Sequence, residues 1–215
     1  MTTLLLIRHG VTAATGSRLG GRTQAELSDA GREQARAVGE RVARAGVRAV
    51  YASPLARTWQ TAEIVGEAVR RAPRACEGLL EVDYGLWTDR SLTSVARTKM
   101  WPVIQSTPSL ARFPDGETIR AAQLRAADAV EELVGRHRRG VIAAVSHADV
   151  IKALVAFYLA LPLDNFQRLH VAPASVTVLA LSSGGRPTLL RLNDDGPLRA
   201  EDLRPPRRTR TGKGR

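Results

Sequence analysis

Two arginines and two histidines each stand at the end of a short apolar run in this sequence, or a few residues beyond it. They are Arg8, His9, Arg57 and His147. Guanidinium groups pair bidentately with phosphate oxygens, and an imidazole can act as a nucleophile or as a hydrogen-bond donor. If the fold brings these four groups together, they form a site for a dianion.

The apolar runs predict the strands that would position these residues. The runs are Thr3–Ile7, Val47–Ala52 and Val141–Val145. Runs that are apolar almost throughout are typical of strands covered on both faces of a parallel sheet. Ligands bind beyond the carboxyl ends of such strands, so the residues that follow the runs should meet at one rim.

Segments with apolar residues at helical spacing alternate with these strands. Helices are predicted from Ser28 to about Gly46, from the cap Ser53 with Pro54 to about Arg70, over Glu117–Arg139, and from about Asp149 to Leu161. Two further strands are predicted at Ser175–Leu181 and Thr188–Leu192. The segment Leu86–Pro114 is expected to be irregular because three prolines break any long element. Together the elements predict an α/β fold, a three-layer α/β/α sandwich with a mostly parallel central sheet.

Composition excludes several classes of protein. The chain has 215 residues, 44% hydrophobic and 25% charged, which is typical of a globular domain and not of a disordered chain. Its longest apolar stretch, Val150–Leu161, is too short to span a bilayer, and its first residues lack the features of a signal peptide. The single cysteine, Cys76, excludes an internal disulfide. We therefore expect a cytoplasmic protein without a membrane partner.

The positive charge is concentrated at one end of the chain. Of the net charge of +11, residues 204–215 contribute +6, since they hold six basic residues and no acid, and the other residues contribute +5. We predict one domain over residues 1–203 and a basic, disordered tail over residues 204–215. Nucleic acid is not expected as a partner, except for weak binding through this tail.

Four motifs occur in a fixed order along the chain. They are Leu6-Ile7-Arg8-His9-Gly10-Val11-Thr12, Ser53-Pro54-Leu55-x-Arg57-x-x-x-Thr61-Ala62, Leu80-Glu81-x-x-x-Gly85-x-Trp87 and Ser146-His147. Together they resemble the motifs of the histidine phosphatase superfamily, which contains cofactor-dependent phosphoglycerate mutases and related phosphatases. The resemblance is to the branch whose proton donor is a glutamate, and it implies a phosphoglycerate mutase-like fold.

The resemblance also implies covalent catalysis. His9 would attack phosphorus and become transiently phosphorylated, while Arg8, Arg57 and His147 would hold the phosphoryl oxygens. Glu81 would protonate the leaving oxygen and then activate the attacking water.

Several further residues have a predicted role near this site. Thr15 and Ser53 are expected to contact the phosphate, and Gly10 to let the backbone approach it closely. No metal and no cofactor is expected, because side chains supply the positive charge. Asp149 is an alternative acid that could instead cap the following helix, and we favour the cap.

Other candidates are weaker. His137 and His170 are interpreted as structural residues. Tryptophans could line a substrate pocket, although the first of them is more typical of a helix core. They are Trp59, Trp87 and Trp101.

The predicted activity is hydrolysis of a small phosphorylated metabolite. The alternatives are a phosphoglycerate mutase-type reaction and a non-catalytic phosphate-binding relative. The segment Leu86–Gly116 shows no long insertion that would cover the phosphohistidine, which favours transfer to water. The sequence differs from the family pattern at Val11, Thr15 and Trp87-Thr88-Asp89, so the identity of the substrate stays open. A homodimer is compatible with the sequence.

Overall fold

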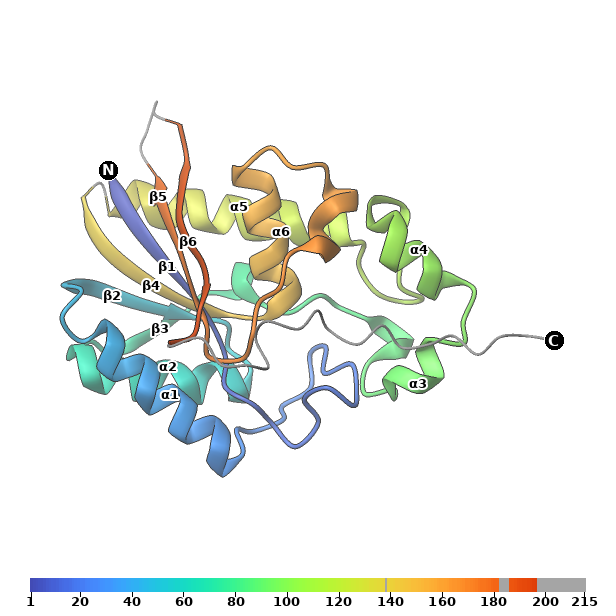
Figure 1. Cartoon of the computed structure of the whole chain (residues 1–215), viewed down its shortest axis with the longest axis horizontal. Helices are drawn as coiled ribbons and strands as arrows, with labels where there is room; N and C mark the ends of the chain where they lie inside the picture. The colour runs from blue at the N-terminus through green and yellow to red at the C-terminus, as the bar shows by residue number, and fades with distance from the viewer. Residues whose placement is uncertain (138, 182–185, 197–215) are drawn as a thin grey trace.

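A computed structural model describes residues 1–137, 139–181 and 186–196 (Figure 1). The predicted tail, residues 204–215, lies outside the described residues. In the described part the strands form one sheet in the order β3-β2-β4-β1-β5-β6. They are β1 (Thr2–Arg8), β2 (Val47–Ala52), β3 (Pro73–Ala75), β4 (Gly140–Ser146), β5 (Val176–Leu181) and β6 (Thr188–Asp194). β1 to β4 run parallel, and β5 is antiparallel to both of its neighbours.

Helices cover both faces of this sheet. The long ones are α1 (Asp29–Val42), α2 (Ala56–Val69), α5 (Ile119–Arg136) and α6 (Ala148–Tyr158). α1 and α2 lie on one face, and α5 and α6 on the other (Figure 1). The predicted three-layer α/β/α sandwich is therefore confirmed. Among the described residues, no helix is both long and apolar enough to cross a membrane.

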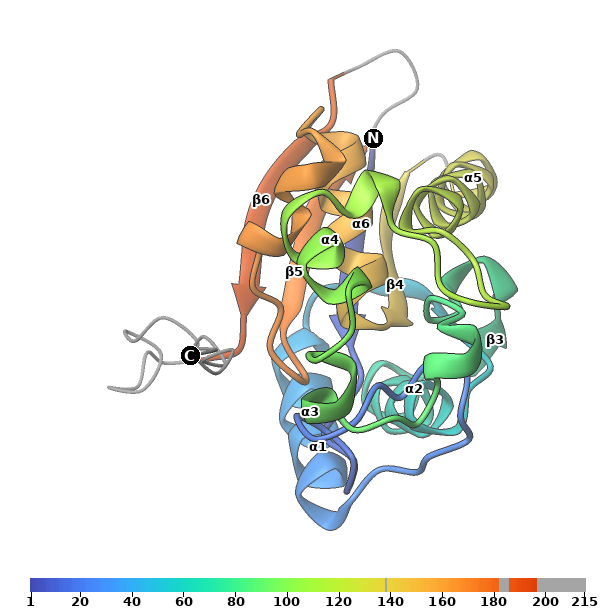
Figure 2. The same ribbon diagram turned by 90° about the vertical axis from the view of Figure 1, so that its right-hand side faces the viewer.

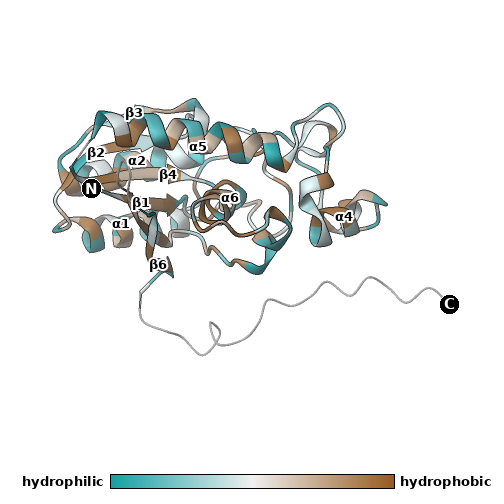
Figure 3. Ribbon diagram, turned by 90° about the horizontal axis from the view of Figure 1, so that it is seen from above, coloured by the Kyte–Doolittle hydropathy of each residue, from teal (hydrophilic) through white to brown (hydrophobic). Residues whose placement is uncertain are grey.

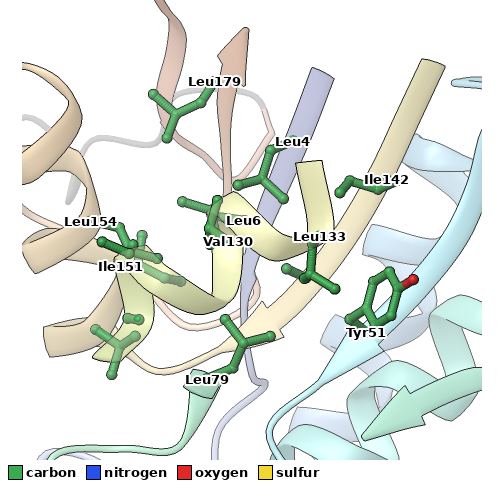
Figure 4. Close-up of a cluster of buried hydrophobic side chains, with 14 of the residues drawn as sticks. Leu4, Leu6, Tyr51, Leu79, Val130, Leu133, Ile142, Ile151, Leu154 and Leu179 are labelled. Carbon is green, nitrogen blue, oxygen red and sulfur yellow. The ribbon is translucent and has the colours of Figure 1, made fainter. Parts of the chain in front are cut away.

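The core follows from the alternation of side chains along the strands. In β1, Leu4 and Leu6 face α5 and α6, whereas Leu5 and Ile7 face α1 and α2. Figure 4 shows Leu4 and Leu6 packed against Val130 of α5. Because both faces of the strands are covered, the central strands are hydrophobic throughout, as the colours of Figure 3 show.

The segment predicted to be irregular contains two short helices. They are α3 (Leu92–Val95) and α4 (Met100–Ser106), on the side of the molecule that faces the viewer in Figure 2. Pro102 is tolerated because it stands in the first turn of α4, where its missing N–H has no helical partner to lose. Val95 and Ile104 pack with Phe113 in a separate hydrophobic cluster. Short 3-10 helices occur at Glu77–Leu79, Gly85–Trp87, Pro108–Leu110 and Leu163–Arg168.

Two helix starts differ from the prediction. α1 begins at the predicted cap, where the Ser28 side chain accepts a hydrogen bond from the Gly31 N–H. α2 does not begin at Ser53, because Leu55 occupies the N-cap position without a side-chain bond. α5 is capped by Thr118 and starts two residues later than predicted. The short edge strand β3 was not predicted.

Candidate active site

The strand register brings the predicted site residues to one edge of the sheet. Arg8 is paired with Ser146 across β1 and β4, and Ala52 with Val145 across β2 and β4. The residues that follow these strand ends therefore lie side by side. A cavity of about 300 Å³ opens at this edge, and Arg8, His9, Arg57 and Glu81 are among the residues that line it.

The His9 ring is held in a single tautomer. Its Nδ1 donates to the Gly10 carbonyl at 2.7 Å, and its Nε2 accepts from Arg57 Nε at 3.3 Å. Burial lowers the pKa of His9 well below its ordinary value, and the charges of Arg57 and Arg8 lower it further. At neutral pH the imidazole is therefore uncharged, and its Nε2 lone pair points toward Arg57, which also lines the cavity.

Arg57 connects the parts of the site. It stands in the first turn of α2, is 3% exposed, and donates to the carbonyls of Thr23 and Gly21 at 2.9 and 2.7 Å. Its Nη2 also donates to His147 Nδ1 at 3.2 Å. One guanidinium thus fixes both imidazoles and the loop that faces them.

Arg8 still has a free donor. Its Nη1 donates to the Val171 carbonyl at 2.7 Å, whereas its buried Nε has no hydrogen-bond partner among the described residues. Burial lowers the pKa of Arg8, but a guanidinium remains charged at neutral pH. A buried donor without a partner is costly unless a ligand satisfies it, so Arg8 is suited to receive an anion.

His147 lies behind the cavity wall and is fully buried. Because Nδ1 accepts from Arg57, the ring proton must be on Nε2, which donates to Ser53 Oγ at 2.9 Å. Ser53 is also fully buried and is absent from the cavity lining. In this structure the Ser53 hydroxyl therefore contacts His147 and not the cavity, and its contact with phosphate stays a prediction.

Of the two acids that line the cavity, Glu81 has the pKa closer to neutrality. It is 8% exposed, its Oε1 accepts from the Val82 N–H at 3.1 Å, and its Oε2 lies 3.9 Å from His147 Nδ1. Burial and the charge of Asp149 raise the pKa of Glu81 to about 7, although Arg57 opposes the shift. Glu81 can therefore both donate and accept a proton near neutral pH.

Asp149 does not cap α6, contrary to the prediction. The N-cap is His147, without a side-chain bond, and Asp149 stands in the first turn. Its carboxylate accepts from Tyr84 Oη at 2.8 Å and from Lys152 Nζ at 3.1 Å. Burial alone would raise the pKa of Asp149, but the Lys152 charge and these two bonds lower it overall. Asp149 is therefore ionised, and its charge favours the protonated form of Glu81.

Several cavity residues escaped the sequence analysis. Tyr84, Lys152 and Arg18 line the cavity, and so does His170, although its sequence context indicates a structural residue. Helical spacing carried a signal for one of them, because Lys152 lies one turn from Asp149 in α6.

Other predicted residues fall into two groups. Thr15 lines the cavity, and its hydroxyl accepts from the Thr12 N–H at 2.8 Å, while its contact with phosphate stays a prediction. His137 lies elsewhere, bonded to Tyr51 Oη at 2.8 Å. The tryptophans are absent from the cavity lining, and Trp87 packs in the core instead.

The structure requires glycine at position 10 for a different reason from the predicted one. A Cβ at Gly10 would lie 2.3 Å from the Gly31 carbonyl oxygen, and one at Gly31 would lie 2.1 Å from the Val11 carbonyl oxygen. Glycine is therefore required here because the loop after β1 crosses α1 closely. Among the described residues, no three histidine, cysteine or acidic side chains are grouped as a metal site would require.

Comparison with known proteins adds independent information. The sequence profile of the histidine phosphatase superfamily (branch 1) matches residues 4–195. Phosphoserine phosphatase 1 of Hydrogenobacter thermophilus is 26% identical over 199 residues, which are 90% of this chain and 92% of that protein. A probable phosphoglycerate mutase of Proteus mirabilis is 31% identical over 183 residues, 82% of this chain and 84% of that protein.

The fold also matches solved structures. A mycobacterial glucosyl-3-phosphoglycerate phosphatase superposes with a TM-score of 0.83 at 27% identity, over 89% of this chain and 98% of that one. The same phosphatase has been solved with VO3 and with inorganic phosphate.

Proposed function

The chain belongs to the histidine phosphatase superfamily (branch 1), and from this premise we propose that it hydrolyses a small phosphomonoester through a phosphohistidine at His9. One observation carries the proposal. The unprotonated Nε2 of His9 lies 3.3 Å from Arg57 Nε, in a cavity that is also lined by Arg8 and by a glutamate whose pKa is raised to about 7. This arrangement combines a nucleophile, an oxyanion-binding pair and a general acid.

The first half of the reaction transfers the phosphoryl group to the enzyme. The Nε2 lone pair of His9 forms a bond to phosphorus, and the bond from phosphorus to the ester oxygen breaks. Glu81 gives its proton to that oxygen, so the alcohol leaves neutral. Arg8 and Arg57 stabilise the charge on the phosphoryl oxygens, and Arg8 Nε already has a donor free for this.

The second half releases phosphate. The ionised Glu81 takes a proton from water, whose oxygen bonds to phosphorus while the bond from phosphorus to Nε2 breaks. His9 regains its lone pair, Glu81 regains its proton, and inorganic phosphate leaves.

His147 contributes to both steps through Arg57. As long as its Nδ1 accepts from Arg57, it positions that guanidinium. A bound dianion would favour a proton on Nδ1, because opposite charges attract. That protonation would break the bond from Arg57 and leave an Nδ1–H to donate toward a phosphoryl oxygen, which is the role that the family resemblance implies.

Hydrolysis fits the cavity better than mutase chemistry does. A mutase must shield its phosphohistidine from water. Of the segment Leu86–Gly116, Leu92 alone contributes to the cavity lining. With so little cover, water can reach phospho-His9, and the relatives that are phosphatases support the same conclusion.

Trapping the intermediate tests the proposal. Rapid acid-free quenching after mixing with an aryl phosphate should give one base-stable, acid-labile phosphohistidine at His9. His9→Ala should lose both this label and turnover, by about 10³-fold or more, with an unchanged circular dichroism spectrum. His137→Ala is the matched control, because that ring lies outside the cavity. Turnover of His9→Ala within about tenfold of the wild type would overturn the mechanism.

A further inference from the structure

An ion pair forms part of the cavity wall beyond the phosphoryl site. Lys152 Nζ lies 3.1 Å from Asp149 Oδ1, and the two side chains are 15% and 22% exposed. Lys152 Nζ also donates to Gln167 Oε1 at 3.2 Å and lies 5.5 Å from the centre of the Phe166 ring. These contacts hold the ammonium group in place, although both charges border the cavity.

The pair keeps unused hydrogen-bonding capacity. A lysine ammonium has three donors, and its contacts among the described residues use two. Each Asp149 oxygen accepts one bond there, from Tyr84 or from Lys152, and can accept another. A ligand in the cavity can therefore bond to a positive and to a negative group at neighbouring positions.

Charge balance in the cavity limits the net charge of this ligand. The cations that line the cavity are Arg8, Arg18, Arg57 and Lys152. Asp149 neutralises Lys152, and Asp89 pairs with Arg18 at 3.3 Å. The two remaining guanidiniums match a phosphoryl dianion. Any further charged group on the ligand would lose its hydration in the cavity without meeting an unpaired opposite charge, which is unfavourable.

The cavity volume limits the size of the ligand. About 300 Å³ is at the lower end of small-molecule sites and must include the phosphoryl group. The enclosed space beside that group therefore suits a short organic part. Charge-assisted hydrogen bonds are about twice as strong as neutral ones, so a dipolar group gains more from this wall than an uncharged diol would.

We propose, on the basis of the phosphatase activity proposed above, that the substrate is an O-phosphorylated amino acid or a similar short zwitterion. Asp149 receives its ammonium group and Lys152 its carboxylate. The phosphoryl group occupies the end of the cavity at His9.

Matched esters test this assignment. The four alkyl esters are O-phospho-L-serine, phosphoethanolamine, 3-phosphohydroxypropionate and glycerol phosphate. Phosphoserine should exceed each of the others in kcat/KM by about tenfold or more. Equal or faster hydrolysis of any of the other three overturns the inference while leaving the phosphatase intact. If neither the four alkyl esters nor phenyl phosphate releases phosphate, the proposed phosphatase function itself fails, and the inference fails with it.

Variants of the pair separate the two contacts. Lys152→Met should lower the ratio of kcat/KM for phosphoserine to that for phosphoethanolamine by about tenfold, and Lys152→Arg should restore it. Asp149→Asn should lower the ratio of phosphoserine to 3-phosphohydroxypropionate. Because ratios compare esters on one variant, they cancel any change in the chemistry that the esters share.

Exposed residues outside the cavity provide matched controls. Lys99→Met and Asp128→Asn should leave both ratios unchanged. If Lys152→Met and Asp149→Asn slow all four esters by the same factor, the pair does not select the substrate and the inference is wrong.

Discussion

The two ends of the cavity are built differently. At the inner end, His9, Arg57 and His147 come from strand ends and from the first turn of α2, are at most 6% exposed, and bond to one another. At the outer end, Arg18 comes from a loop, and its side chain is 49% exposed. The inner end cannot rearrange without breaking several bonds at once, whereas the outer end can. Phosphoryl transfer thus depends on the interlocked groups of the inner end. Selection of the organic part of the substrate depends on the groups of the outer end.

The largest expected effect compares arginines from the two ends. Arg57→Ala should lower kcat/KM for phenyl phosphate by about 10³-fold or more, because it removes a phosphoryl donor and releases both imidazoles. Arg18→Ala should lower it by less than about tenfold, since its partner is the exposed Asp89.

Steady-state kinetics on variants with matched circular dichroism spectra measures this difference. Falls of similar size in the two variants would contradict the separation of the cavity into two ends.

A second, smaller effect distinguishes the two acids. Glu81→Gln should slow an alkyl phosphate by about 10²-fold to 10³-fold, because the poor leaving group needs a proton. First-turnover release of nitrophenol from its phosphate ester should change by less than about tenfold, since nitrophenolate leaves without one.

Asp149→Asn should instead act through Glu81. Removing the neighbouring charge lowers the pKa of Glu81 from about 7, so the alkaline limb of the pH–rate profile moves to lower pH. The loss for the alkyl ester should be small near pH 6 and about tenfold near pH 8. Leaving-group dependence in Asp149→Asn and not in Glu81→Gln would reverse the assignment of the acid.

The contrast between local and long-range contacts explains what the sequence could predict. The positions of His9 and His147 follow from the apolar runs just before them, and the sandwich follows from the alternation of strands and helices. The role of Ser53 does not follow from its neighbours in the sequence, because its hydrogen-bond partner His147 is 94 residues away. Nothing near Gly10 indicates that it faces Gly31.

The acids show the same limit. Asp149 has the position of a helix cap, but its hydrogen-bond partner Tyr84 is 65 residues away and turns it toward the cavity. In the segment of short helices, Pro102 was interpreted as a breaker because the start of α4 carries no clear local signal. Contacts between distant segments decided the outcomes for Ser53, Gly10 and Asp149.

The smallest expected effect concerns the stability of the inner end. Glu81 has a pKa of about 7 in the folded protein, against an ordinary value of 4.5. Below the lower value both states carry the proton. Between the two values only the folded state keeps it, and stability declines as the pH rises. Above pH 7 the folded protein holds a buried carboxylate, and the loss is complete.

Glutamine in place of Glu81 removes this pH dependence. Glu81→Gln should match the wild type near pH 4.5 and exceed its free energy of unfolding by on the order of 1 kcal/mol at pH 8. Urea unfolding at the two pH values measures the difference, and Glu40→Gln, at an exposed position of α1, should show none. A Glu81→Gln variant that is no more stable than the wild type at pH 8 would mean that the raised pKa carries no cost to the fold. The inner end would then be no more strained than the outer one.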